Sequence, residues 1–322
     1  MGKKRWFWIG IVVGGLMLVS CCAAASAPLL LMGGGSLFPW GSGVALIEIR
    51  GVIASEPVYT LSGLGTGSRI IIEQLRSAEE DPNVKAVLLY INSPGGSVVA
   101  SDEIYQQLKK MDKPVLAYLG DIAASGAYYV ACGADKIMAH PASLTGSIGV
   151  IVEMPNVEKL MQKLGIEMTV IKSGPFKDEG SFYRGMTEEE KAYWQGLVNQ
   201  VHEMFVDVVA KERGLPKEKV AAIADGRVYL GKDALEMGLV DELGSFEDAL
   251  TLAAEMGGIS GRPRIIRYRT APGLLDLLFS GSAFNPRWLS EELRNLLPLT
   301  RSPALLYMYK VYTQPGNNAP VH

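Results

Sequence analysis

The sequence predicts an α/β domain with a largely parallel sheet, preceded by one transmembrane helix. Short runs of branched aliphatic residues alternate with stretches of helical periodicity, which is typical of layered α/β domains. The 322 residues are 48% hydrophobic and 20% charged, enough apolar material for a full core. An uncharged apolar stretch directly after Lys3-Lys4-Arg5 predicts the membrane segment.

The N-terminal apolar segment is long enough to cross a bilayer. Residues 6–32 carry no charge, and roughly 20 helical residues span the hydrocarbon layer. We expect residues 1–5 to stay in the cytoplasm and the chain after about residue 40 to lie on the extracytoplasmic side of the cell membrane, because basic flanks remain inside. Two alternatives would remove this segment: Ala25-Ser26-Ala27 is typical of a signal-peptidase site, and Leu18-Val19-Ser20-Cys21 of a bacterial lipoprotein box. An uncleaved anchor is preferred because the apolar run continues past both.

The folded domain is predicted to begin after a Gly/Ser-rich linker at residues 33–43, and to occupy residues 44–270. Its first elements are a strand at 44–49, a helix at 68–80 and a strand at 84–91. The alternation continues with predicted helices at 99–111, 126–133 and 157–164 and predicted strands at 115–119, 136–139 and 168–171. Such alternation predicts parallel strands joined by crossover helices.

Helices are predicted to dominate the rest of the chain. Thr187-Glu188-Glu189-Glu190 has the pattern of a capping box that opens a long helix ending near residue 213. Further helices are expected at 216–223, 231–237 and 246–256, followed by a helical extension at 271–313 and a disordered tail at 314–322.

Composition and motifs exclude several classes of function. The net charge of -3, with both signs mixed throughout, provides no positive field for nucleic acid. Cys21, Cys22 and Cys132 have neither metal-ligand nor disulfide spacing, and the sequence contains no HExxH or Walker motif. The glycine-rich run at 63–67 follows no predicted strand, so we interpret it as a loop rather than a dinucleotide site. No cofactor or metal is therefore expected.

The histidines do not favour a Ser-His-Asp triad. His140 precedes a proline at a strand end, His202 lies in the middle of a predicted helix, and His322 is the last residue. None lies in a turn rich in glycine or serine, although the sequence leaves their proximity to a serine in space open. We expect ordinary structural roles for all three.

Two sharp turns after predicted strands are candidates for catalytic loops. In the turn at 92–97, consecutive glycines allow backbone N–H groups to approach a ligand without interference from a Cβ atom. In the turn at 120–127, small residues surround Ser125, and a predicted helix begins directly behind it. A hydroxyl there is exposed at a helix N-terminus, where negative charge is favoured. Ser125 is therefore a candidate nucleophile, with a simple helix cap as the alternative.

A serine nucleophile needs a base, and Lys177 is the best candidate once histidine is set aside. It follows a predicted strand in the loop Lys172-Ser173-Gly174-Pro175-Phe176-Lys177-Asp178, where Phe176 and Phe182 offer apolar cover. A lysine acts as a base near neutral pH only when burial removes its proton. The alternative is a solvated lysine paired with Asp178.

At these residues the sequence resembles the signal peptide peptidase A family, in its short single-domain bacterial and archaeal form. The resemblance runs from about residue 44 to 246 and implies the layered fold shared with Clp protease and the crotonases. It rests on five motifs in order: Asn92-Ser93-Pro94-Gly95-Gly96, Ala123-Ala124-Ser125-Gly126 with Tyr128-Tyr129, Leu144-Thr145-Gly146-Ser147-Ile148-Gly149-Val150, Lys172-Ser173-Gly174 with Lys177-Asp178, and Ala224-Asp225-Gly226-Arg227-Val228-Tyr229.

The resemblance assigns a role to each matching residue. It implies that Ser125 is the nucleophile, that Lys177 is the general base and that Ser147 orients the lysine. The backbone N–H groups of Gly96 and Gly126 match the oxyanion hole of the family. Short family members also form rings in which the lysine reaches the serine of a neighbouring protomer, and we expect the same homo-oligomer here.

The function implied by the resemblance is a membrane-anchored serine endopeptidase that degrades signal peptides remaining in the bilayer after secretory processing. A membrane peptidase of the same fold with another protein substrate is one alternative. A non-catalytic membrane scaffold is the second, although both dyad residues are present. A crotonase that binds coenzyme A is the third, but the sequence supplies neither a basic adenosine site nor a catalytic carboxylate.

Overall fold

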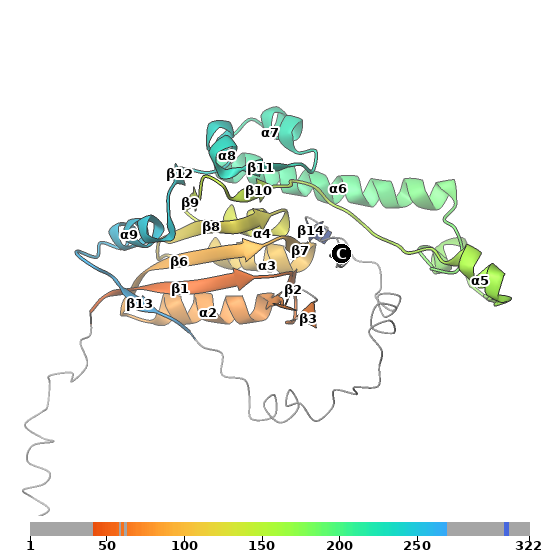
Figure 1. Cartoon of the computed structure of the whole chain (residues 1–322), viewed down its shortest axis with the longest axis horizontal. Coiled ribbons are helices and arrows are strands. Elements are labelled where there is room, and N and C mark those ends of the chain that lie inside the picture. The colour runs from red at the N-terminus through yellow and green to blue at the C-terminus, as the bar shows by residue number, and fades with distance from the viewer. Residues whose placement is uncertain (1–40, 58, 61–62, 269–305, 309–322) are drawn as a thin grey trace, which may run out of the picture. The chain divides into compact units, whose positions relative to one another are not determined.

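The computed structural model of the protein describes residues 41–57, 59–60, 63–268 and 306–308 (Figure 1). The predicted cytoplasmic region at 1–5, the anchor at 6–32 and the tail at 314–322 lie outside these residues, as do most of the linker and of the C-terminal extension. Among the described helices, none combines the length and the apolar character needed to cross a membrane.

A mostly parallel sheet forms the centre of the described domain. Its main strand order is β11-β10-β8-β6-β1-β13, with β9 joining the edge of β8 and β12 pairing with β9. Every pair is parallel except the pair of β10 and β11. The strands are β1 (Gly43–Arg50), β6 (Val84–Ser93), β8 (Val115–Ala124), β9 (Lys136–Ala139), β10 (Leu144–Gly146), β11 (Val228–Leu230), β12 (Glu242–Leu243) and β13 (Arg264–Ile266). The predicted α/β class is confirmed.

The central strands are apolar on both faces because helices cover both sides of the sheet. Along β1, the side chains of Ala45, Ile47 and Ile49 belong to one buried cluster, whereas Val44 and Leu46 belong to the other. This alternation follows the two-residue period of a strand. A strand covered on both faces is a continuous apolar run, which is why 44–49 and 84–91 were recognisable in the sequence.

Helices cover both faces of the sheet. The buried cluster that contains Ala45, Ile47 and Ile49 is the larger one, and several helices pack on it, whereas α9 packs on the smaller cluster on the other face. Buried residues of α2, α3 and α4 join the larger cluster, together with the C-terminal half of α6, while Ala249, Ala253 and Ala254 of α9 join the smaller one. The helices are α2 (Ser68–Glu80), α3 (Val98–Leu108), α4 (Gly126–Ala131), α5 (Glu158–Leu164), α6 (Glu188–Arg213), α7 (Lys217–Ile223), α8 (Gly231–Met237) and α9 (Phe246–Met256), with the 3-10 helix η1 (Pro175–Asp178) before α6. The predicted capping box at Thr187 is present.

A second, smaller sheet includes β7, the strand that follows β6 in the chain. Its order is β14-β7-β2-β5, formed by β14 (Leu306–Met308), β7 (Gly95–Ser97), β2 (Ile53–Ala54) and β5 (Thr66–Gly67). A separate pair joins β3 (Tyr59–Thr60) and β4 (Gly63–Leu64). The glycine-rich run at 63–67 is therefore two short strands rather than a loop. Within the predicted helical extension at 271–313, the part that the structure describes is the strand β14, which pairs antiparallel with β7.

Three local predictions were wrong, and pairing with neighbouring strands explains each. Residues 168–171 form no strand, because their side chains are exposed and none of the described strands pairs with them. Strand β8 continues through the predicted turn as far as Ala124, since its last residues pair with β10. The predicted turn at Gly95 and Gly96 is the strand β7, which pairs with β2 and β14. Strand formation depends on partners that a local sequence window does not contain.

Candidate active site

Ser125 lies between the end of β8 and the start of α4 in a strained backbone conformation. Its φ is 55° and its ψ is -122°, a region that residues with a Cβ atom rarely occupy. The residue stands at the N-cap position of α4, but its hydroxyl makes no capping hydrogen bond. The alternative role of a simple cap therefore does not describe it. The side chain is 1% exposed, at the wall of a cavity.

Hydrogen bonds on both sides hold this strained turn in place. The N–H of Ser125 donates to the carbonyl oxygen of Gly146 at 2.7 Å, and the N–H of Tyr129 donates to the carbonyl oxygen of Ser125 at 2.9 Å. Behind the turn, the buried hydroxyl of Tyr128 donates to the carbonyl of Leu239 at 2.7 Å, and that of Tyr129 bonds Asp102 at 2.7 Å. The two tyrosines of the motif thus anchor α4, and α4 fixes the serine.

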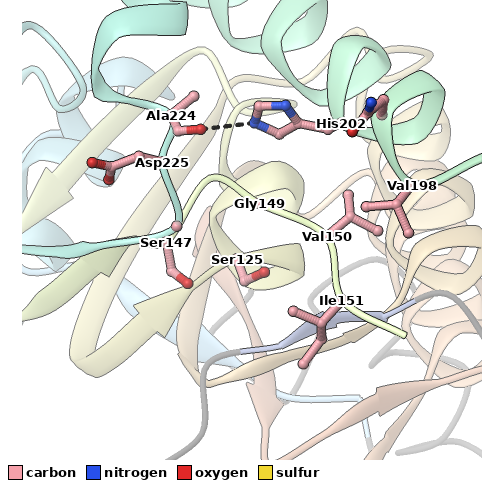
Figure 2. Close-up of a pocket in the computed structure, with 11 residues that line it drawn as sticks. Ser125, Ser147, Gly149, Val150, Ile151, Val198, His202, Ala224 and Asp225 are labelled. Carbon is pink, nitrogen blue, oxygen red and sulfur yellow. Dashed lines mark hydrogen bonds between the residues drawn. The ribbon is translucent and has the colours of Figure 1, made fainter. Parts of the chain in front are cut away.

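Ser147 faces the same cavity from the neighbouring strand. It directly follows β10, has a φ of 52°, and its N–H donates to the carbonyl of Arg227 at 2.8 Å. Figure 2 shows the side chains of Ser125 and Ser147 directed into one space. The cavity has a volume of about 360 Å³, and its other walls come from Gly149, Val150, Ile151, Val198, Asn199, His202, Ala224, Asp225 and Gly226. This brings three of the sequence motifs and α6 together.

His202 is a cavity residue that the sequence did not reveal. It lies on α6, far along the chain from Ser125, and no local pattern distinguishes it from a structural histidine. Its Nε2 lies 2.8 Å from the carbonyl oxygen of Ala224, as the dashed line in Figure 2 marks. A carbonyl oxygen only accepts hydrogen bonds, so Nε2 carries the proton and is not free to deprotonate a serine. The imidazole shapes the cavity wall.

Gly96 and Gly126, the predicted backbone donors, lie in β7 and at the start of α4. Gly126 is the first residue of α4, so its N–H has no acceptor within the helix. Gly96 is the central residue of β7, where a Cβ atom would come within 2.0 Å of the carbonyl oxygen of Ile53. Only glycine fits there. Helix α4 contacts both β7 and β14, so these strands lie beside the serine turn.

Lys177 lies in η1 and lines a different cavity from that of Ser125. The lysine side chain is exposed and forms no ion pair within the described chain. Its cavity, of about 610 Å³, is formed by the η1 segment and Trp194 of α6, and contains neither Ser125 nor Ser147. Within one copy of the chain, the structure brings Ser125 and Ser147 together but does not bring Lys177 to them.

The carboxylate beside Lys177 is engaged elsewhere. Asp178 is 9% exposed and accepts from Lys172 Nζ at 2.7 Å and from Arg184 Nε at 2.9 Å. Arg184 also donates through Nη1 to Glu190 Oε2 at 2.9 Å, at the start of α6. The proposed pairing of Lys177 with Asp178, the structural alternative for the lysine, is thus absent. The network instead fixes η1 to the first turn of α6.

The electrostatics of this network follow from its hydrogen bonds. Arg184 and Lys172 hold the pKa of Asp178 well below its usual range. Arg184, with the N–H of Thr187, lowers the pKa of Glu190 to about 2. Both carboxylates therefore stay ionised throughout the neutral range, and the anchor of η1 is insensitive to pH there.

Other reactive groups of the described chain do not suit catalysis. Burial raises the pKa of the Cys132 thiol to about 12, which keeps it protonated and unreactive. No three His, Cys, Asp or Glu side chains of the described residues are grouped as the ligands of a metal ion would be.

Comparison with known proteins identifies the family. The model of Peptidase family S49 matches residues 107–260, and the Clp protease model matches residues 55–146. A putative protease of Synechocystis is 44% identical over 67% of this chain and 75% of its own length. A putative protease of Methanocaldococcus jannaschii is 44% identical over 62% of this chain and 65% of its own. The putative signal peptide peptidase SppA of Enterococcus faecium is 41% identical over 64% of this chain and 61% of its own.

The parallel α/β fold and these matches define the class of the protein, which is a serine-type peptidase with a fold like that of Clp protease. More narrowly, the chain belongs to peptidase family S49. The two matched ranges together include Ser125, Ser147 and Lys177.

Proposed function

We propose that the protein is a membrane-anchored endopeptidase with a Ser/Lys dyad, in which Ser125 is the nucleophile and Lys177 of a second copy is the general base. The observation that carries the proposal is the conformation of Ser125. A serine held at a φ of 55°, facing a cavity without capping its own helix, is placed for attack rather than for helix stability.

The chemistry is acyl transfer in two steps. Neutral Lys177 Nζ accepts the proton of Ser125 Oγ while Oγ bonds to the carbonyl carbon of the scissile peptide. The C–N bond breaks, and the leaving amine takes the proton back from the lysine. Water then attacks the ester, Lys177 again acting as base, and releases the free acid and Ser125.

Backbone donors stabilise the charge on the peptide oxygen. The N–H of Gly126 has no acceptor in its helix, and Gly96 allows β7 to approach β2 closely. We assign these two N–H groups to the oxyanion hole. A donor of this kind contributes roughly 3–4 kcal/mol to transition-state stabilisation.

The separate locations of the two dyad residues favour a site shared between protomers. Lys177 lines a cavity without Ser125, yet the segment that carries it is tied firmly to α6. The segment from α5 to η1, residues 158–178, also exposes Leu164, Met168 and Ile171, the last of them 97% exposed. Contact with a second copy would cover this apolar surface. This contact would also bring Lys177 to Ser125 and Ser147 of the second copy, and we assign Ser147 to orienting the lysine. It would exclude water from the lysine, so that the lysine loses its proton.

Signal peptides left in the membrane are the proposed substrates. The relative from Enterococcus faecium is named a putative signal peptide peptidase. Residues 6–32 of the chain carry no charge, and an anchor there would hold the catalytic domain outside the membrane surface, close to such peptides.

The test mixes two inactive proteins. Ser125→Ala and Lys177→Ala are each purified, confirmed as folded, and then assembled together after subunit exchange. We expect each variant alone to cleave a fluorogenic apolar peptide at least about 1000-fold more slowly than the natural protein. In an equal mixture, part of the natural activity should return, because a neighbour pair can combine an intact serine with an intact lysine.

Lys163→Ala is the matched control, since Lys163 is an exposed lysine on α5, in the same segment of residues 158–178 as Lys177. It should retain full activity. Absence of recovery in oligomers shown to contain both chains would exclude the shared site. Full activity of either single variant would exclude the dyad itself. A cleavage profile over a peptide library then separates signal-peptide cores from other substrates.

A further inference from the structure

The segment of residues 158–178, which carries Lys177, has little apolar core of its own. Helix α5, which is described throughout, contains no buried residue, and the buried residue of η1 is Asp178. Ile171 is 97% exposed, and the ring of Phe176 packs on the ring of Tyr193, which is itself half exposed. Apolar burial therefore does little to fix the direction in which η1 points, and polar contacts must do so.

Arg184 joins two buried carboxylates that belong to different elements. Its Nε donates to Asp178 Oδ2 at 2.9 Å and its Nη2 donates to Asp178 Oδ1 at 2.6 Å, at the end of η1. Its Nη1 donates to Glu190 Oε2 at 2.9 Å, in the first turn of α6. The side chains of Asp178 and Glu190 are 8% and 6% exposed. A single guanidinium group thus connects η1 to α6.

Lys172 holds η1 at both of its ends. Its Nζ donates to the carbonyl oxygen of Pro175 at 3.0 Å and to Asp178 Oδ1 at 2.7 Å, and these are the first and last residues of η1. Successive residues of a 3-10 helix project about 120° apart, because the helix has three residues per turn. Since Asp178 is directed into the network, Lys177 is directed away from it, which agrees with the exposure of the lysine side chain.

The cost of burying these charges indicates a role other than stability. Buried ionic networks contribute little net stability, because removing charges from water is costly, and their best-attested role is to fix a register. We propose that Arg184 is a positioning residue for Lys177: its bonds to Asp178 and Glu190 fix where η1 presents the lysine to Ser125 of the neighbouring copy. Arg184 lines neither the cavity of Ser125 nor that of Lys177, so it acts through η1. The inference rests on the proposed function, in which Lys177 is the general base.

The experiment places one change in either half of the shared site. In the mixture of Ser125→Ala and Lys177→Ala chains, the first chain supplies the lysine and the second supplies the serine. Arg184→Lys keeps the positive charge but replaces the guanidinium fork by a single ammonium group. In the lysine-supplying chain it should lower the recovered kcat at least about tenfold, because a displaced catalytic group loses much of its effect. In the serine-supplying chain the recovered kcat should change less than about twofold.

Two further substitutions define what the asymmetry means. Lys191→Met removes an exposed ion pair on the same helix and should leave the recovered kcat unchanged in either chain. Glu190→Gln keeps the size of the side chain and removes its charge, and it should repeat the asymmetry of Arg184→Lys, so that failure of one variant to assemble does not end the test. Equal losses in both chains would show that Arg184 supports the whole fold, and no loss in either chain would show that it does not position the lysine. Either result overturns the proposal.

Measurements on otherwise natural protein separate this inference from the shared site. Absence of recovery in the parent mixture would remove the shared site, and that mixture is measured first. Arg184→Lys alone should lower kcat at least about tenfold and change KM less than about twofold. The amides of Lys177 and Ser181 donate to the carbonyl oxygens of Gly174 and Asp178, so hydrogen exchange at 172–183 should become faster in this variant, while exchange at 123–131 stays the same. Unchanged kcat or unchanged exchange at 172–183 would overturn the proposal, whether or not the dyad is shared between copies.

Discussion

Ser125 and Ser147 occupy equivalent places on two paired strands. Ala124 of β8 is paired with Gly146 of β10, and each serine is the residue that follows. Both have a positive φ, 55° for Ser125 and 52° for Ser147, and among the described residues no other residue with a side chain has one. Two strained serines at the carboxyl ends of neighbouring parallel strands, facing one cavity, support the proposed catalytic role of this sheet edge.

The strain at Ser125 predicts that a residue with a Cβ atom at this position lowers the stability of the fold. Changing Ser125 to glycine should abolish peptide cleavage and stabilise the fold, because glycine adopts a φ of 55° and a ψ of -122° without a Cβ clash. We expect Ser125→Gly to be more stable than Ser125→Ala by roughly 1–2 kcal/mol in urea unfolding. Alanine is the matched control, since it also lacks the hydroxyl but keeps the Cβ atom. Equal stability of the two variants would show that the turn stores no strain.

Close packing of β7 on β2 predicts that Gly96 tolerates no side chain. In Gly96→Ala the new Cβ would approach the carbonyl oxygen of Ile53 to 2.0 Å, so the backbone must move. We expect a loss of roughly 1–3 kcal/mol in the free energy of unfolding and a large fall in kcat. Gly196→Ala is the control, because nothing lies within 4 Å of its Cβ position. On helix α6 it should stabilise by about 0.5–1 kcal/mol. Similar effects at both positions would contradict this reading of the strand contact.

The network around Arg184 predicts a pH dependence of stability at acid pH. The pKa of Asp178 and that of Glu190 are lowered in the folded protein. The network therefore stabilises the fold fully at pH values above about 4, the pKa of these carboxyl groups in the unfolded chain. Its contribution is lost as pH falls from about 4 towards 2, where Glu190 becomes protonated. Arg184→Met should therefore show a shallower fall in the urea midpoint between pH 5 and pH 3 than the natural protein.

Lys191→Met serves as the control for this measurement. Lys191 pairs with Glu188, but both side chains are exposed, at 57% and 89%. Exposed pairs contribute little, so the pH profile should match that of the natural protein. Parallel profiles for natural protein and Arg184→Met would show that the network does not depend on the two carboxylates.

The pairing of β14 with β7 predicts that residues 306–308 compete with substrate peptides for the edge of β7. Residues 306–308 pair antiparallel with Gly95–Ser97, and an extended peptide binds by adding a strand to a sheet edge in the same manner. A chain that ends at residue 303 leaves the edge of β7 free and should show a several-fold lower KM for peptides. A chain that ends at residue 308 keeps β14 and should behave as the full-length protein does. Equal KM values for the two truncated chains would mean that β14 does not occupy the substrate edge.

The sequence predicted elements with a strong local signal and missed those made by distant partners. The amphipathic helix at 68–80 and the capping box of Thr187 with Glu190 depend on residues three or four apart, so they were recognisable. Strand β14 and the second half of β8 depend on pairing with residues far along the chain.

The same distinction holds at the candidate site. Ser125 stood out because a turn of small residues follows an apolar strand. His202 could not be connected to it, since α6 reaches the cavity only through tertiary packing. The ion pair between Asp178 and Arg184 was not predicted for a similar reason: Arg184 lies six residues away across a turn that no helical or strand periodicity describes.

Helix α6 connects the core of the domain to the segment that carries Lys177. Phe205, Val206 and Val209 fasten one end of it into the core, and Glu190 holds the Lys177 segment at the other. Phe205 follows Glu190 by 15 positions along the helix, which corresponds to about 22 Å at 1.5 Å per residue. The length of the helix therefore fixes how far the segment that carries Lys177 lies from the core of its own chain. Adding one residue would lengthen it slightly and also turn its tip by 100°. In the proposed shared site, the distance between the cores of the two copies would therefore depend on the number of residues in this helix.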